Sequence, residues 1–356
     1  MDLALYDPEF GYYARAAQRS GRAGDFFTSV DVGPVFGELL AVQLEEMGGI
    51  LGSTSDFDLV EAGAGNGRLS TDILRALRTR APRTYDRVRL HLVESSAQAR
   101  AAQRGTLDDM ADHLQMSGPA LPASFEGLLI ANELLDALPT HQVVMRPQGL
   151  QEVYVEYRNR RLATCEGPPS TDALGAYLHR LGVRLEPGWR GEINLRAVEW
   201  IEDVARRLTR GFVVLVDYGH EARELYSATH SSGTLTTFAR HTMRGPEAEF
   251  GAEAWLQEPG LQDITAHVDF TSVRLAAEAA GLMSLGFLDQ TYFLMGLMSH
   301  GFKDTDLGSP EHFKKRLALK TLLMPGGLGS THKVLIFGKG VGSPMLCGCS
   351  QAMRVT

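Results

Sequence analysis

Short apolar runs alternate with amphipathic stretches along much of the chain. Apolar runs of strand length, ended by polar or glycine residues, lie at 57–61, 88–94, 128–131, 212–217 and 334–337. Apolar residues three or four positions apart predict helices at 35–47, 69–77, 97–104, 172–181, 195–208 and 271–280. Strands that alternate with helices form βαβ units. We therefore expect an α/β fold with a mostly parallel sheet and helices on both faces.

Two parts of the chain break this alternation and predict insertions. Around Asn159, short segments of strand-like pattern predict a small β-ribbon with its turn at that residue. With the helices that follow, the ribbon would form an inserted cap over 140–208, and the loop-rich stretch at 240–260 would form a second insertion. After it, Thr271 is the expected N-cap of the next helix. Residues 340–356 show no periodic pattern and are expected to form a surface tail.

Composition changes this picture mainly by exclusion. The 356 residues carry a formal net charge of −8, which argues against nucleic-acid binding because nucleic-acid binders usually present a basic face. Three cysteines cannot build a disulfide framework in so long a chain, so a reducing compartment is favoured. No apolar run approaches the roughly 18 residues of a membrane-spanning helix, and the first residues lack the basic region of a signal peptide. We expect a soluble intracellular protein.

A glycine-rich loop lies between the first predicted strand and the helix after it. It reads Glu61-Ala62-Gly63-Ala64-Gly65-Asn66-Gly67, and its glycines would let the backbone approach a bound nucleotide closely. Dinucleotide-binding loops have the spacing GxGxxG and cradle a pyrophosphate, whereas this loop has GxGxG preceded by an acid. Such an acid would repel a pyrophosphate but suits S-adenosylmethionine, which carries an amino group, a sulfonium cation and no phosphate. A nicotinamide-dependent dehydrogenase is the rival interpretation.

Acidic side chains follow the next two strands, at the sheet edge where open α/β folds bind their ligands. Glu94 ends the second strand, where a carboxylate can accept both hydroxyls of an adenosine ribose. Asn132, Glu133 and Asp136 follow the third strand. On a helix the two acids would share one face and could hold a guanidinium by charge-assisted hydrogen bonds. The alternative is an ordinary helix N-terminus, which also favours acids.

Further motifs are spread over residues 3–337. They include LALYDP at 3–8, GDFFTS at 24–29, NELLDALP at 132–139, DYG at 217–219 and DITAHVDF at 263–270. Together with the glycine loop, they resemble the MidA-like family, which includes a mitochondrial protein arginine methyltransferase that assists complex I assembly. The resemblance implies a class I methyltransferase fold, Rossmann-like, with S-adenosylmethionine as methyl donor. It also implies symmetric dimethylation of an arginine on a subunit of a respiratory complex.

The residues and the resemblance together predict two groups of site residues. Glu133, Asp136 and His267 are the candidate catalytic residues, and a structural role is the alternative for His267. Phe26 and Thr28 would lie in a loop that family members fold over the cofactor. The full set of candidate cofactor-binding residues is Phe26, Thr28, Glu61, Gly63, Ala64, Gly65, Gly67, Glu94, Ser95 and Asn132. Since no cluster has the sequence spacing of metal ligands, no metal is expected.

The same reasoning sets the expected organisation and partners. Residues 1–50 would pack on the cofactor site, and 56–339 would form the methyltransferase core with its cap insertions. Family members have a helical segment before the LYDP motif, so we expect the natural chain to be longer. The partner would be a protein with an exposed arginine, such as a complex I subunit, in the bacterial cytoplasm or the mitochondrial matrix, without nucleic acid or membrane insertion. A cofactor-binding chaperone without turnover and a homodimeric state stay open.

Overall fold

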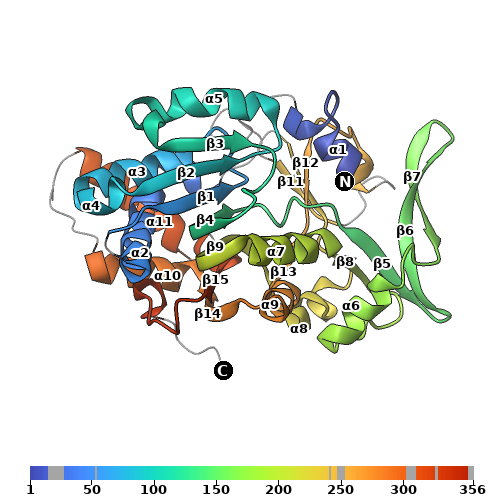
Figure 1. Ribbon diagram of the computed structural model, residues 1–356. Helices are drawn as coiled ribbons and strands as arrows, with labels where there is room; N and C mark the ends of the chain where they lie inside the picture. Colours follow the sequence, from blue (N-terminus) through green and yellow to red (C-terminus); the bar gives the residue numbers. More distant parts are fainter. Residues whose placement is uncertain are drawn as a thin grey trace.

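The computed structural model describes residues 1–14, 28–52, 54–239, 242–246, 253–301, 310–324 and 328–351. Its centre is a sheet with the strand order β14-β15-β9-β4-β1-β2-β3, and β13 (Val268–Asp269) pairs with the end of β9 (Figure 1). The strands are β1 (Phe57–Ala62), β2 (Val88–Val93), β3 (Leu114–Gly118), β4 (Phe125–Asn132), β9 (Leu208–His220), β14 (Met283–Asp289) and β15 (His332–Lys339). The strands from β9 to β3 run parallel to one another, whereas β15 runs antiparallel to both of its neighbours, β9 and β14. The predicted mostly parallel sheet is confirmed.

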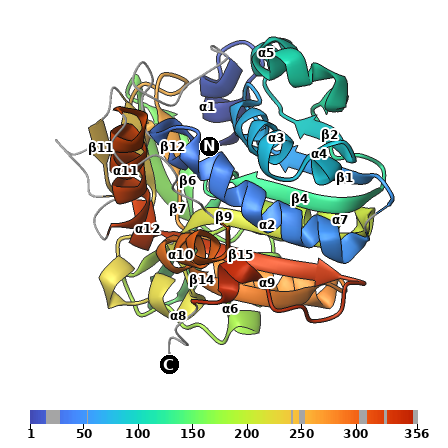
Figure 2. The ribbon, with the colours of Figure 1, turned by 90° about the vertical axis from the view of Figure 1, so that its left-hand side faces the viewer.

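Helices cover both faces of this sheet because its strands point alternate side chains into two apolar cores. In β4, Leu128 and Ile130 belong to one core, and Leu129 and Ala131 belong to the other. The first core is covered by α2 (Val35–Leu51), α3 (Arg68–Arg80), α5 (Ala97–Leu107), α10 (Gln290–Gly301) and α11 (Pro310–Leu323). The second is covered by α7 (Leu195–Arg207) and α9 (Phe270–Ala279). In Figure 2, α2 crosses in front of the sheet.

A second sheet stands at one end of the molecule, apart from the central one (Figure 1). Its order is β7-β6-β5-β8, and its strands are β5 (His141–Arg146), β6 (Gly149–Arg158), β7 (Arg161–Gly167) and β8 (Arg190–Ile193). Asn159 turns β6 into β7 with a left-handed φ of 50°, so the predicted β-ribbon and its turn are confirmed. Helix α6 (Ala173–Leu181) packs on this sheet. Helix α7 packs mainly on the central sheet, while Leu195 and Val198 in its first turn also contact the apolar cluster of the second sheet.

A small third sheet joins β10 (Thr236–Ala239), β11 (Thr242–Arg244) and β12 (Asp263–Thr265). The connection from β12 leads through β13 into α9. The N-cap of α9 is Asp269, whose carboxylate accepts a hydrogen bond from the Ser272 amide at 3.0 Å. The prediction of Thr271 as N-cap was therefore wrong. The Thr271 hydroxyl instead accepts a hydrogen bond from the Ala222 amide.

The segment after β15 also differs from its expectation. Residues 340–351 are not a surface tail, because Leu346 and Cys347 are buried against the first core. Glu46 of α2 accepts a hydrogen bond from the Cys347 amide at 2.9 Å, and Gln43 accepts one from the Gly348 amide at 3.1 Å. These partners come from a distant helix, so no local pattern announces the packing. Within the described residues, the helices are all too short or too polar to cross a membrane.

Candidate functional site

A pocket of about 340 Å³ lies at the carboxyl ends of β1, β2 and β4. Helix α1 (Asp2–Tyr6) lies near the arrowheads of these strands in Figure 1, and the N-terminal region closes one side of the pocket. Its wall includes Tyr6, Tyr13, Thr28, Glu61, Gly63, Ala64, Gly65, Glu94, Ser95, Asn132 and Glu133. Most of the predicted site residues thus meet in one cavity. Gly67, Asp136 and His267 lie off its wall, and Phe26 lies outside the described residues.

The glycine loop owes its shape to backbone conformations that other residues adopt at a cost. Gly63 and Gly65 have φ values of 73° and 50°, and the amides of Gly63 and Ala64 both donate hydrogen bonds to the Val93 carbonyl. These bonds join the ends of β1 and β2. A side chain at Gly63 would also start only 3.2 Å from the side chain of Leu134, which lines the same pocket. Gly67 is the N-cap of α3, and its amide donates a hydrogen bond to the Ala64 carbonyl of the loop.

Glu61 holds the start of α3 against β1. Its carboxylate is buried and accepts hydrogen bonds from both the amide and the hydroxyl of Ser70. Burial raises the pKa of the Glu61 carboxyl to about 7. Glu61 therefore fixes the N-terminal end of α3 beside the pocket. Glu61 also forms part of the pocket wall.

Glu94 connects the glycine loop to the turn after β2. One carboxylate oxygen accepts a hydrogen bond from the Gly65 amide at 2.9 Å, and the other accepts one from the Ser96 amide at 2.8 Å. The Ser95 hydroxyl donates to the same group at 3.3 Å. A carboxylate has about four lone-pair sites, so after these three hydrogen bonds Glu94 keeps capacity for about one more from a ligand hydroxyl.

The segment after β4 is a loop, so Glu133 and Asp136 do not share the face that a helix would have given them. Glu133 has a left-handed φ of 50°, and the chain then wraps round the carboxylate of Asp217 in β9. Asp217 Oδ2 accepts hydrogen bonds from the amides of Leu134 at 3.1 Å and Leu135 at 2.8 Å. Burial raises the pKa of Asp217 to about 7. This side chain takes the place of helical hydrogen bonds in the loop.

Glu133 projects to the pocket wall, where three groups meet its Oε1 atom. The Ser29 amide and the Asn132 side-chain amide each donate a hydrogen bond at 3.3 Å, and His332 Nε2 lies 3.5 Å away. Burial lowers the pKa of His332, but the nearby Glu133 carboxylate, together with Asp217, outweighs burial, so the pKa is raised above its ordinary value. His332 opens β15, far along the chain from Glu133. The sequence carries no local signal that pairs the two.

Asp136 and His267 lie behind this wall. The buried Asp136 carboxyl is hydrogen-bonded by Tyr218, and burial together with the charge of Asp217 raises its pKa well above the ordinary range. The Asp136 carbonyl accepts a hydrogen bond from the Ala266 amide at 3.0 Å. The ring of His267 stands edge-on to that of Tyr218, with centroids 5.6 Å apart. Of the three predicted catalytic residues, only Glu133 reaches the pocket.

Comparisons with known proteins point to one class of enzyme. Residues 39–288 match the family model Methyltransf_28, described as "Putative S-adenosyl-L-methionine-dependent methyltransferase". The chain is 29% identical to "Protein arginine methyltransferase NDUFAF7 homolog, mitochondrial" of Drosophila melanogaster, over 96% of this chain and 80% of that protein. It is 30% identical to "Protein arginine methyltransferase NDUFAF7, mitochondrial" of Mus musculus, over 83% and 69%.

A solved structure agrees with these sequence matches. A COG1565 superfamily member from Burkholderia thailandensis, bound to S-adenosyl-homocysteine, superposes with a TM-score of 0.87 at 29% identity. The alignment covers 99% of this chain and 90% of that one. S-adenosyl-homocysteine is what remains of S-adenosylmethionine after methyl transfer. S-adenosylmethionine is therefore the cofactor, and the matches favour a methyltransferase over the rival dehydrogenase.

Proposed function

Because the chain belongs to the Methyltransf_28 family of S-adenosylmethionine-dependent methyltransferases, we propose that it methylates an arginine side chain of a protein partner. The observation that carries this proposal is the position of Glu133. Its carboxylate lies on the wall of the same pocket as Gly65 and Glu94, so an acceptor held by Glu133 would meet the cofactor directly. The names of the relatives from Drosophila melanogaster and Mus musculus support arginine as the acceptor.

The pocket offers groups that fit each polar part of the cofactor. Glu94 would accept the ribose hydroxyls at the end of β2. Asn132 Oδ1 is buried and has no hydrogen-bond partner among the described residues, so it is placed to accept a hydrogen bond from the amino group of the cofactor. Tyr6 and Tyr13 would cover the bound molecule from the N-terminal side. When bound, S-adenosylmethionine supplies an electrophilic methyl group next to Glu133.

Glu133 would make the acceptor nitrogen available for the transfer. An arginine side chain is always protonated near neutrality, with its charge spread over the guanidinium. A carboxylate that binds one edge draws the positive charge toward that edge and fixes the direction of the remaining nitrogen. That nitrogen forms a bond to the methyl carbon as the carbon–sulfur bond breaks, and it then releases a proton to water. Asp136 would act on this step only by supporting the loop from behind.

The acceptor protein is proposed from the relatives. We propose a subunit of respiratory complex I or a similar protein, with symmetric dimethylation of the arginine, in the bacterial cytoplasm or in the mitochondrial matrix. The relatives named above are mitochondrial by name. A homodimer would be compatible with this function, since the pocket described here is built from one chain.

The decisive experiment combines labelled S-adenosylmethionine, extract from cells that lack the protein, and mapping of the labelled residue. We expect label on arginine, and we expect Glu133→Gln to lower the rate on the order of 100-fold while S-adenosyl-homocysteine still binds. Glu199→Gln, at an exposed position on α7, is the matched control and should leave both the rate and the binding of S-adenosyl-homocysteine unchanged. Label on a carboxylate, a hydroxyl or nucleic acid would refute the proposed acceptor. Normal maturation of the partner without any label would favour a chaperone.

A further inference from the structure

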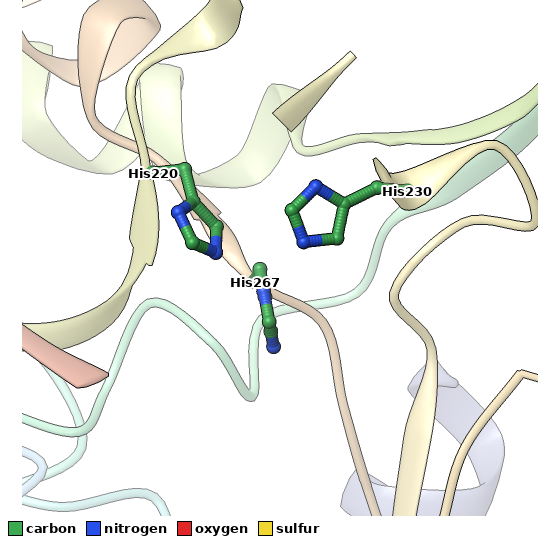
Figure 3. A group of neighbouring side chains, drawn as sticks. All are labelled: His220, His230 and His267. Carbon is green, nitrogen blue, oxygen red and sulfur yellow. The ribbon is translucent and has the colours of Figure 1, made fainter. Parts of the chain in front are cut away.

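Three histidines from separate parts of the chain meet beside the end of β9. His220 ends β9, His230 ends the 3₁₀ helix Ala228–His230, and His267 lies between β12 and β13. One ring nitrogen from each lies within 4.8 Å of the other two, and the rings surround a common space (Figure 3). We propose that His220, His230 and His267 bind a divalent transition-metal ion of the zinc type.

The surroundings of the cluster fix how the His230 ring presents its nitrogens and place a carboxylate near His220. The Glu224 carbonyl lies 3.0 Å from His230 Nδ1, and a carbonyl can only accept a hydrogen bond. His230 Nδ1 therefore carries the proton, and Nε2 keeps the lone pair that a metal requires. The Glu224 carboxylate lies 3.1 Å from His220 Nδ1. A carbonyl or carboxylate behind a ligating imidazole is the usual outer shell of a histidine metal site.

An unpaired nitrogen in the cluster also favours a bound cation over a bound anion. The rings of His220 and His267 lie together with their centroids 5.2 Å apart. His267 Nδ1 is buried without a hydrogen-bond partner among the described residues. Neutral imidazoles with free lone pairs are metal ligands, and an unsatisfied buried nitrogen gains a partner when a metal binds.

The ligand set narrows the choice of ion. Three imidazoles suit zinc, cobalt, nickel or copper, whereas calcium and magnesium prefer oxygen ligands. Zinc–nitrogen bonds of about 2.0–2.1 Å require the nitrogens of a tetrahedral site to approach to roughly 3.3 Å. Small rotations of the rings would achieve this. A water molecule would complete the four ligands, as in open zinc sites.

A metal at this place would brace the loop behind Glu133. Ala266, next to His267, donates the hydrogen bond to the Asp136 carbonyl. The ring of Tyr218 lies between His267 and His332, with centroid distances of 5.6 and 5.7 Å, and His332 contacts Glu133. The site would tie the end of β9, the 3₁₀ helix and the β12–β13 connection together. It does not depend on which acceptor the enzyme methylates.

The test uses the full-length chain without an affinity tag, stripped of metal and titrated with Co²⁺. The visible absorption of tetrahedral Co²⁺ should saturate at one equivalent, and Zn²⁺ should displace it. His230→Ala should weaken Co²⁺ binding at least about tenfold, because it removes one of the three ligands. The helix that carries His230 has no buried residue, so the change should leave the fold intact. Glu224→Gln should weaken it less, since its side chain is 63% exposed and only orients His220. His300→Ala, an exposed histidine on α10, is the control that should bind like the natural chain.

Folding is checked by the affinity of each variant for S-adenosyl-homocysteine, which the cluster does not touch. Equal Co²⁺ binding by the natural chain and by His230→Ala would overturn the proposal, as would binding without the tetrahedral spectrum. No saturable binding by the natural chain would also overturn it and would leave the rings as an aromatic cluster, with centroids 4.7–5.8 Å apart.

Discussion

The two sides of the pocket are built in different ways. The cofactor side is made from segments close in sequence, where Gly65 and Glu94 bind each other and the ends of β1 and β2 are joined through backbone amides. The acceptor side is made from distant segments. Glu133 follows β4, its loop is held by Asp217 of β9, and its carboxylate meets Ser29 and His332.

This difference separates two kinds of change. A substitution on the cofactor side should alter the affinity for S-adenosylmethionine and leave the acceptor loop in place. A substitution on the acceptor side should weaken cofactor binding much less than it slows methyl transfer, because Asp217 holds the amides of Leu134 and Leu135 rather than those of the glycine loop. Glycine loops that bind through their backbone tolerate changes elsewhere in the fold, whereas a loop wrapped round one carboxylate depends on that single residue.

Asp217→Ala tests how far the loop after β4 depends on Asp217, and it should lower the rate of methyl transfer more than the other changes proposed for the two sides. The change leaves the amides of Leu134 and Leu135 buried without their acceptor, which costs about 2–4 kcal/mol of stability. Because the loop would no longer present Glu133, methyl transfer should fall on the order of 100-fold or more. Calorimetric titration with S-adenosyl-homocysteine should show an affinity within a few-fold of the natural chain. Asp112→Ala, at an exposed position, is the control and should leave the stability, the rate of methyl transfer and the affinity for S-adenosyl-homocysteine unchanged.

Glu94→Gln tests the opposite side. The amide keeps the shape of the side chain but loses the charge, and a hydrogen bond to a charged group is worth about 1.5–3 kcal/mol. We expect affinity for S-adenosyl-homocysteine to fall about tenfold or more, and the rate at saturating cofactor to change little. A loss of rate with unchanged affinity would show that the two sides are not separate.

The same contrast explains what the sequence could predict. The glycine loop, Glu94 and the βαβ order were predictable because a local spacing encodes each of them. The loop after β4 could not be predicted, because Asp217 accepts hydrogen bonds from the amides of Leu134 and Leu135 and no local pattern reveals a partner on β9. Asp136 was placed on the acceptor side for the same reason, although Tyr218 holds it behind the pocket wall.

Other errors also came from partners that are distant in sequence. Cys347 and Leu346 were assigned to a tail, because the helix α2 that buries them begins at Val35. The histidine cluster was missed because His220 ends β9 while His267 lies in the β12–β13 connection, and their positions in the sequence have no motif spacing. In each case the fold brings together residues that are far apart in the sequence, so no local pattern could reveal the contact.

His332 gives a finer test of the acceptor side through the dependence of the rate on pH. Below its raised pKa, His332 is a cation next to Glu133. Its positive charge then offsets the negative charge with which Glu133 would bind the acceptor arginine. Since that pKa lies above 6.5, kcat/KM should rise a few-fold as the pH increases from 6 through the folded pKa. In His332→Gln this step should disappear, and at pH 6 the variant should be a few-fold faster than the natural chain.

The stability of the fold should change in the opposite direction over the same range. A histidine whose pKa is raised by folding adds stability that is fully present below its unfolded pKa, near 6.5, and is lost as the pH rises through the folded value. The natural chain should therefore lose a little stability between pH 6 and 8 that His332→Gln does not lose, while its methyl transfer improves. His300→Gln, on the exposed end of α10, should keep both pH profiles of the natural chain. If the rate of His332→Gln followed the natural profile, the ion pair with Glu133 would have no part in binding the acceptor, and Glu133 would act through Asn132 and Ser29 alone.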